Sequence, residues 1–312
     1  MSVLVTGASG FVGAHVRALL AERAKTSPLV VHAASSEGGF DLTDRQATAW
    51  AVAELKPSAV IHLAAIAAPR QAHADPRRAW DVNLTGTMNL AEAVMRHAPQ
   101  ARFIHVGSSE AYGASFAACA ERPITEDAAL NPVNTYGATK AAADMMIGQM
   151  SHDGLRAIRF RPFNHTGPGQ ADAFVVPAFA RQIADIVVNG AEPVIRVGNL
   201  DGKRDFLDVR DVVRAYVDAA LGAGEWRPGL VFNLSTGTPR SIRSLLDALI
   251  AAAGRPIAIE LDPDRMRPND LPSAAGANEA VGVHLGWRPR IDIATTLRDV
   301  LEDWKMRLAD RK

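Results

Sequence analysis

The chain has little of what marks secreted, membrane-spanning or nucleic-acid-binding proteins. Its 312 residues include one cysteine, Cys119, which excludes an intramolecular disulfide and a cysteine-cluster metal site. Its 34 basic and 34 acidic side chains balance, so no overall field attracts nucleic acid or an anionic membrane. No apolar run approaches the roughly 20 residues that span a bilayer, and no basic segment typical of a signal peptide opens the chain. We therefore expect a cytoplasmic protein without metal, nucleic-acid partner or membrane partner.

The first half of the chain alternates short apolar runs with longer amphipathic stretches. The runs predict buried strands at 3–5, 29–31, 59–63 and 102–106, followed later by 155–160 and 230–234. The amphipathic stretches predict helices at 11–23, 44–55 and 83–97. Such alternation is typical of a parallel sheet with helices on both faces. The sequence therefore predicts an α/β fold built on a Rossmann-type doubly wound parallel sheet.

The second half changes in texture after residue 162. Proline and glycine become frequent there, and short elements replace the regular alternation. We expect two domains. Residues 1–163 with about 205–236 would form a dinucleotide-binding domain, and about 164–204 and 237–312 would form a smaller, discontinuous substrate-binding domain.

A glycine-rich turn directly follows the first predicted strand and opens the first predicted helix. Gly7 permits a tight turn, Gly10 lets the backbone approach a pyrophosphate, and Gly13 lets the helix pack closely on the strand. The amides around Phe11 and Val12, together with the helix macrodipole, would then face the phosphates. An ordinary strand-to-helix turn is the alternative. The position at the first strand of a β-α-β pattern favours a dinucleotide site.

The end of the second predicted strand bears on the choice of dinucleotide. NAD-binding folds usually carry an acidic residue there to bind the ribose 2′-hydroxyl. The stretch 31–36 has no carboxylate and no arginine, and only Ser35 and Ser36 offer hydrogen-bond donors. The absence of a carboxylate leaves room for a 2′-phosphate. The sequence therefore favours NADP(H) and leaves NAD(H) possible.

Two further segments are candidate cofactor contacts. Asp41, followed by Leu42, lies where a loop carboxylate accepts a hydrogen bond from the adenine amino group, although it could instead cap the following helix. Leu63, Ala64 and Ala65 follow the strand at 59–63. Their small size suits a place where a cofactor passes close to the backbone.

A tyrosine and a lysine supply candidate proton chemistry. Tyr136 and Lys140 are four residues apart, so they share one face of a helix. A nearby ammonium would lower the pKa of a tyrosine from its usual value of about 10. The phenol could then deliver a proton to an alkoxide that forms as hydride arrives. A surface Tyr/Lys pair is the alternative. Ser108, just after the strand at 102–106, could hydrogen-bond the same carbonyl oxygen.

With this order of glycine turn, serine, tyrosine and lysine, the chain resembles the extended short-chain dehydrogenase/reductase family. The resemblance implies that Ser108, Tyr136 and Lys140 are catalytic and that Tyr136 and Lys140 also contact the cofactor. It implies that Asn83 helps to hold the lysine and its helix, with a plain helix N-cap as the alternative, and it places Asn83 and Arg161 among the cofactor contacts. Related enzymes pair two helices into a dimer interface, so the surplus apolar residues at 145–147 suggest a homodimer.

Segments of the second half resemble the nucleotide-sugar branch of that family. They are 161–170, 174–182, 197–206 and 267–272. The resemblance implies a GDP-linked sugar that contacts Ser108, Ser109, Glu110, Asn164, Val176, Arg181, Arg204, Arg267 and Asp270. Arginines suit a diphosphate, and a carboxylate suits a ribose diol. Solvated loop residues are the alternative for each one, and Asp208 is expected to be a helix N-cap.

The expected reaction is NAD(P)H-dependent reduction of a C4 ketone on a nucleotide-linked 4-dehydro-6-deoxy sugar. By resemblance, this is GDP-4-dehydro-6-deoxy-D-mannose reduced to GDP-D-rhamnose. Glu110 leaves an alternative open, because related 4,6-dehydratases carry a glutamate two residues after the serine position as a base at C5. A 4,6-dehydratase, a 4-epimerase or the reductase that forms the C4-epimeric 6-deoxy-talose are therefore alternatives. A non-catalytic NADP-binding sensor is a more distant one.

Overall fold

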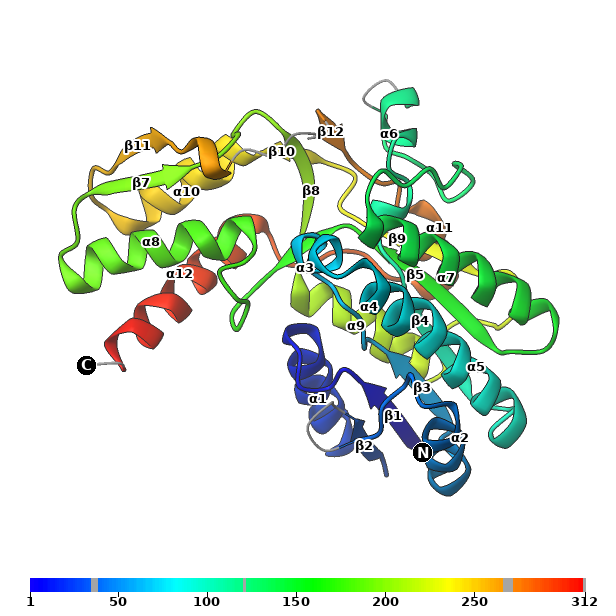
Figure 1. The fold of residues 1–312 in the computed structure, drawn as a ribbon. Helices are drawn as coiled ribbons and strands as arrows, with labels where there is room; N and C mark the ends of the chain where they lie inside the picture. Colours follow the sequence, from blue (N-terminus) through cyan, green and yellow to red (C-terminus); the bar gives the residue numbers. More distant parts are fainter. Residues whose placement is uncertain (35–38, 120–121, 266–271, 311–312) are drawn as a thin grey trace.

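A six-stranded parallel sheet forms the centre of the computed structural model, which describes residues 1–34, 39–119, 122–265 and 272–310 (Figure 1). The strand order is β2-β1-β3-β4-β5-β9, and each neighbouring pair is parallel. The strands are β1 (Ser2–Thr6), β2 (Val30–Ala34), β3 (Ala59–His62), β4 (Arg102–Val106), β5 (Ala157–Pro162) and β9 (Val231–Leu234). The predicted Rossmann-type α/β fold is confirmed.

Helices cover both faces of this sheet. Successive side chains of a strand point to opposite faces, so each strand contributes residues to the cores on both sides. Val3 and Val5 pack in a core with the helices of one face, and Leu4 packs in a core with those of the other. The first face is covered by α1 (Phe11–Ala24), α9 (Val209–Ala220) and α11 (Glu279–Leu285). The second is covered by α2 (Arg45–Leu55), α5 (Gly86–His97) and α7 (Thr135–His152).

A second core lies beyond the sheet, to the left of it in Figure 1. Its helices are α8 (Val175–Asn189), α10 (Ile242–Ala253) and α12 (Ile293–Ala309). Beside them, β8 (Lys203–Asp208) pairs with β6 (Asn164–Thr166), β10 (Pro239–Ser241) and β12 (Ser273–Ala274), while β7 (Val194–Val197) pairs with β11 (Ala258–Leu261). The predicted domain boundary at 204/205 falls inside β8. Val281 and Trp287, predicted for the substrate domain, pack in the core of the six-stranded sheet.

Short helical segments complete the described chain. They are α3 (Pro69–Ala74), α4 (Pro76–Trp80), a π-helix η1 (Asp81–Thr85), α6 (Ser115–Ala118), and the 3-10 helices η2 (Ser109–Ala111) and η3 (Pro263–Arg265). Both α3 and α4 begin with proline, which has the backbone angle of a first helical turn and no N–H to leave unpaired. No helix in the described part of the chain is long and apolar enough to cross a membrane.

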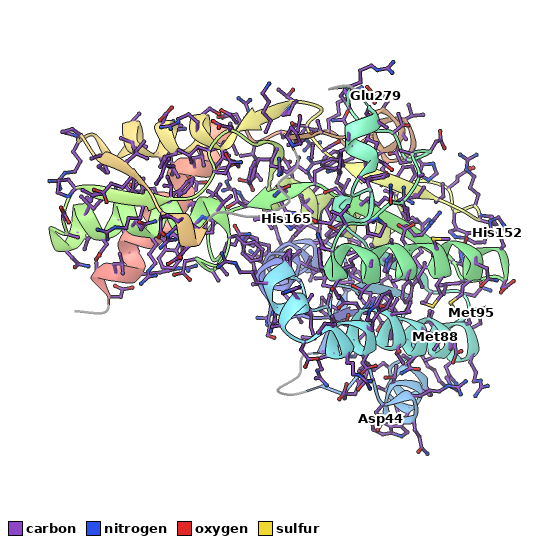
Figure 2. All side chains as sticks on the ribbon, turned by 45° about the horizontal axis from the view of Figure 1, so that its top comes forward. Asp44, Met88, Met95, His152, His165 and Glu279 are labelled. Carbon is purple, nitrogen blue, oxygen red and sulfur yellow. The ribbon has the colours of Figure 1, made fainter. Side chains whose placement is uncertain are left out.

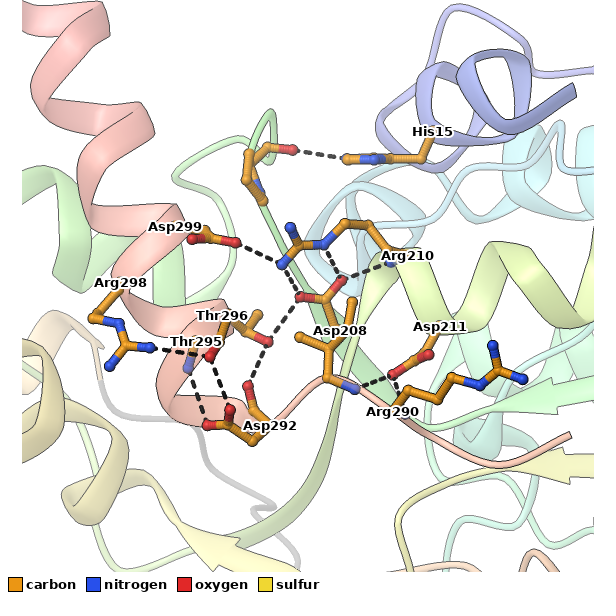
Figure 3. Close-up of polar contacts among 12 residues, drawn as sticks. His15, Asp208, Arg210, Asp211, Arg290, Asp292, Thr295, Thr296, Arg298 and Asp299 are labelled. Carbon is orange, nitrogen blue, oxygen red and sulfur yellow. Dashed lines mark hydrogen bonds and ion pairs between the residues drawn. The ribbon is translucent and has the colours of Figure 1, made fainter. Parts of the chain in front are cut away.

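A polar cluster ties the second core to the helices of the sheet (Figure 3). Asp208 caps α9 by accepting from the Arg210 amide at 2.7 Å, so its predicted role as an N-cap is confirmed. The same carboxylate accepts from the Thr296 hydroxyl of α12 at 2.8 Å, and Arg210 also pairs with Asp299 of α12 at 2.6 Å. On α1, the His15 ring hydrogen-bonds the Pro168 carbonyl at 2.8 Å. These contacts fix the relative position of the two cores, between which a cavity opens.

Candidate active site

A cavity of about 1000 Å³ runs along the carboxyl edge of the sheet and under α8. The glycine turn, residues 39–43, residues 63–65, residues 107–110 and the pair Tyr136 and Lys140 line its sheet side. Residues 162–166, 172–179 and 196–199 line the other side, and His165 lies at the junction of the two halves (Figure 2). The volume suits a large small-molecule ligand, and open α/β sheets bind ligands at this edge.

The glycine turn has the shape of a phosphate cradle. Gly7 has a φ of +69°, and a Cβ on it would lie 2.7 Å from the Ala64 amide nitrogen. A Cβ on Gly13 would lie 2.3 Å from the Gly7 carbonyl oxygen. α1 begins immediately after Gly10, and no side chain caps its free amides. Such amides at a helix start bind anions, so the residues present fit the pyrophosphate of a dinucleotide.

The stretch 39–43 forms one end of the cavity. Asp41 accepts hydrogen bonds from the Thr43 amide at 2.9 Å and the Thr43 hydroxyl at 2.8 Å, and these bonds lower the pKa of Asp41. Asp44 caps α2, so the alternative of Asp41 as that cap is wrong. Leu42 and Asp41 both line the cavity. Ser35, the other contact predicted near this end, lies outside the described residues.

Ser108, Tyr136 and Lys140 come together on the wall of the cavity. Ser108 precedes η2 at the end of β4, and Tyr136 and Lys140 lie on α7. The Ser108 side chain hydrogen-bonds the Tyr136 hydroxyl, and the Lys140 ammonium donates to the Val106 carbonyl at 2.8 Å. Ser108 and Tyr136 thus adjoin a point at which a carbonyl oxygen could receive a hydrogen bond and a proton, with Lys140 on the same wall.

The electrostatics of this wall differ in part from the expectation. Burial, with a smaller contribution from Glu110, raises the pKa of Tyr136 to about 12, while the hydrogen bond from Ser108 opposes the rise. The expected lowering of this pKa by Lys140 is not found, because burial dominates and the ammonium faces the Val106 carbonyl. Burial lowers the pKa of Lys140 to about 8. Tyr136 is therefore protonated at neutral pH, as a proton donor must be.

Asn83 ties the catalytic helix to the loop after β3. It lies inside η1, so the alternative of a plain N-cap is wrong. Its side chain accepts from the Ile66 amide at 2.8 Å and donates to the Thr139 hydroxyl at 2.9 Å. Thr139 precedes Lys140, so Asn83 fixes the turn of α7 that carries the lysine.

Arg161 requires a correction. Its side chain is only 6% exposed, does not line the cavity and donates to both carboxylate oxygens of Asp144, at 3.1 and 2.8 Å. It also donates to the Tyr112 hydroxyl at 2.9 Å. A guanidinium with these partners is not available to the cofactor. Asp144 lies one turn after Lys140, and Tyr112 lies four residues after Ser108, so Arg161 instead joins the two segments that carry the catalytic groups.

Some of the residues predicted to contact the substrate line the cavity, and others do not. Asn164, Val176 and Arg204 line the cavity, as do Ser109 and Glu110 on the sheet side. Arg181 does not line the cavity. Its guanidinium pairs at 2.6 Å with Asp172, which does line it, so the predicted direct contact between Arg181 and the substrate needs correction. Arg267 and Asp270 lie outside the described residues.

Two arginines at this end were not predicted. Arg196 and Arg265 line the cavity, and they pair with Glu260 at 3.5 Å and with Asp262 at 3.0 Å. Nothing in their local sequence marks them, because they reach the cavity only through the packing of β7 and η3. No cluster of His, Cys, Asp or Glu that could hold a metal ion exists in the part of the chain that the structure describes.

Comparison with known proteins gives the family. A family model described as GDP-mannose 4,6 dehydratase matches residues 4–300. The chain belongs to the GDP-mannose 4,6-dehydratase family. A GDP-6-deoxy-D-mannose reductase of Pseudomonas aeruginosa is 37% identical over 99% of this chain and 98% of its own length. A UDP-glucose 4-epimerase of Mycolicibacterium smegmatis is 31% identical over 97% of this chain and 98% of its own. The resemblance to extended short-chain dehydrogenases/reductases is confirmed, and this family member is an oxidoreductase acting on nucleotide sugars.

Solved structures of family members agree over the whole chain. A structure of the Pseudomonas aeruginosa protein called RMD, complexed with NADPH, has a TM-score of 0.87 at 35% identity and covers 98% of this chain and 99% of that one. A Thermus thermophilus UDP-glucose 4-epimerase complexed with NAD has a TM-score of 0.80 at 25% identity, covering 98% and 99%. The family thus includes members solved with NADPH and members solved with NAD.

Proposed function

We propose that this protein is a reductase that uses NADPH or NADH to reduce the C4 ketone of GDP-4-dehydro-6-deoxy-D-mannose, giving GDP-D-rhamnose. The observation that carries the proposal is the trio Ser108, Tyr136 and Lys140 on the wall of a cavity with a glycine cradle. Full-length similarity to a GDP-6-deoxy-D-mannose reductase supports the substrate. The similarity to an NADPH-bound structure supports the cofactor.

The protein's own residues supply positioning and a proton. Bound NAD(P)H supplies the hydride. Ser108 orients the ketone oxygen, and the protonated Tyr136 hydroxyl donates its proton to that oxygen as negative charge develops there. Lys140 adds positive charge to the same wall and, by resemblance, binds the nicotinamide ribose. Asn164 and Arg204, which line the cavity, would bind the diphosphate of the substrate.

The test is oxidation of NADPH, with NADH in parallel, in the presence of GDP-4-dehydro-6-deoxy-D-mannose generated in place from GDP-mannose by a dehydratase. We expect rapid, enzyme-dependent loss of NADPH absorbance. NMR of the sugar product assigns the C4 configuration, with rhamnose expected and 6-deoxy-talose as the alternative product. An absence of oxidation with both cofactors would reject the reductase.

Glu110 keeps elimination or epimerisation as a second candidate. Its carboxylate lines the cavity and lies close enough to Tyr136 to raise that pKa. It also accepts from the Asn134 amide at 2.9 Å, and Asn134 caps α7. This contact gives Glu110 a role in holding the catalytic helix that needs no proton transfer. An enzyme using Glu110 as a base would act on GDP-mannose or another nucleotide sugar without net consumption of cofactor.

Replacing Glu110 with glutamine tests its electrostatic effect on Tyr136. Glutamine still accepts the Asn134 hydrogen bond but removes the negative charge that raises the pKa of Tyr136. The pKa of Tyr136 should fall, and protonated Tyr136 is the donor in reduction, so the alkaline limb of the pH–turnover profile should move to lower pH. The control is Glu92→Gln, whose carboxylate pairs with Arg45 on the surface. A limb that stays in place in Glu110→Gln would contradict this assignment.

We further propose a cytoplasmic homodimer formed through α5 and α7. Met88 on α5 and Met145 on α7 are exposed, Met145 to 64%, and the two helices lie side by side (Figure 2). Burying such side chains against a second copy removes apolar surface from water. Met145→Glu should therefore shift sedimentation from dimer to monomer. Met306→Glu on α12, exposed to 60%, is the matched control and should remain dimeric. A wild-type protein that sediments as a monomer would refute the dimer.

A further inference from the structure

Two arginines that line the cavity have no carboxylate partner among the residues that the structure describes. Arg70 on α3 and Arg78 on α4 both line the cavity. Within the described residues, neither guanidinium makes a hydrogen bond or an ion pair. The cavity-lining arginines Arg196 and Arg265, at the substrate end, are paired with carboxylates. An unpaired cation at a cavity wall suits an anionic group of a ligand.

Of these two arginines, Arg78 is the one whose charge acts on Asp41, the residue expected to contact the adenine. Asp41 and Arg78 line the same cavity; the Thr43 hydrogen bonds lower the pKa of Asp41 most, and the charge of Arg78 adds a smaller contribution in the same direction. Asp41 belongs to the stretch 39–43, which follows β2 and forms that end of the cavity. α4 holds Arg78 in place, because Asp75 caps the helix by accepting from the Arg78 amide at 3.0 Å and the neighbouring Ala79 is fully buried.

The charges of a dinucleotide decide what Arg78 would bind. The glycine turn offers its amides to the pyrophosphate. NADPH carries one more anion, the 2′-phosphate on its adenosine ribose. The described end of β2 carries no arginine or lysine that could pair with it, since it consists of His32, Ala33 and Ala34. The Asp41 carboxylate alone would repel a phosphate at this end. A guanidinium both offsets that charge and donates two parallel hydrogen bonds to phosphate.

We propose that Arg78 binds the 2′-phosphate of NADPH and thereby gives the enzyme its preference for NADPH over NADH. The inference rests on the proposed NAD(P)H-dependent function and names the residue that discriminates between the two cofactors. It places the discriminating residue on α4, outside the loop after β2 where such residues are usually sought.

Binding of two adenosine fragments to Arg78→Gln tests the proposal. The fragments are 2′,5′-ADP, which carries the 2′-phosphate, and 5′-ADP, which does not. By calorimetry, the affinity for 2′,5′-ADP should fall by roughly tenfold or more, whereas that for 5′-ADP should stay the same. The KM for NADPH should rise by a similar factor, and the KM for NADH should not change. Arg77→Gln is the matched control, because Arg77 is exposed on the same helix but does not line the cavity.

Two results would overturn the assignment. An equal loss of affinity for both fragments would show that Arg78 acts through Asp41 or the adenine ring. Unchanged affinity for 2′,5′-ADP would show that another group binds the phosphate. Fragment binding needs no sugar substrate and no turnover, so it can be read even if the proposed reductase reaction fails.

Discussion

Replacing Tyr136 with phenylalanine is expected to lower turnover by roughly 10²–10⁴-fold while cofactor binding survives. The substitution removes only the hydroxyl that hydrogen-bonds Ser108 and leaves the ring on α7 in place. Without the proton donor, the developing alkoxide has no partner on this wall able to neutralise it fully. Steady-state kinetics and titration of NADPH binding by fluorescence check the two halves of the prediction.

The turnover of Ser108→Ala should lie between that of the wild type and that of Tyr136→Phe. Ser108 orients the carbonyl oxygen but transfers no proton in the proposed reaction, so its loss should cost less turnover than the loss of the Tyr136 hydroxyl. Near-normal turnover in Tyr136→Phe would remove Tyr136 from the chemistry.

Replacing Asp144 with alanine is expected to destabilise the fold by about 3–5 kcal/mol. The Asp144 side chain is 1% exposed and pairs with Arg159 at 2.7 Å and with Arg161 at 2.8 Å, both of which are largely buried. Its removal leaves two buried guanidinium groups without their counter-ion. The free energy of unfolding in urea gives the loss, provided that unfolding is two-state.

An exposed ion pair provides the control for Asp144→Ala. Glu92 pairs with Arg45 at 2.9 Å, and the two side chains are 39% and 71% exposed. Glu92→Gln should change stability by less than about 1 kcal/mol, because water and salt screen such a pair. A loss of similar size in both variants would contradict the account of the Asp144 cluster.

The sheet and the catalytic trio could be predicted because their signals are local. Most of the predicted strands are mainly apolar, as expected of strands in the middle of a parallel sheet, and the predicted positions of β1, β3 and β4 agree with the structure to within a residue or so. The glycine turn had to follow β1 for its amides to meet a ligand. Tyr136 and Lys140 share one helix face by spacing alone.

The remaining site residues could not be predicted because tertiary packing determines their environment. Arg161 lies near the end of β5, just before Asn164, yet its side chain turns inward to Asp144 and Tyr112, which are 17 and 49 residues away in the sequence. Arg78 lines the cavity only because α4 packs against α7, which the local sequence does not reveal. The pKa of Tyr136 depends on burial, which spacing to Lys140 does not reveal.

The most direct test of the central claim is transfer of deuterium from C4-deuterated NADPH to the sugar. The enzyme is incubated with GDP-4-dehydro-6-deoxy-D-mannose and cofactor labelled on either face of the nicotinamide, and the product is analysed by mass spectrometry and NMR. The account predicts one deuterium at the sugar C4 for every cofactor oxidised, from one of the two labelled forms. Products without deuterium at C4 from both labelled forms, or exchange of solvent hydrogen at C5 without net oxidation of cofactor, would contradict it.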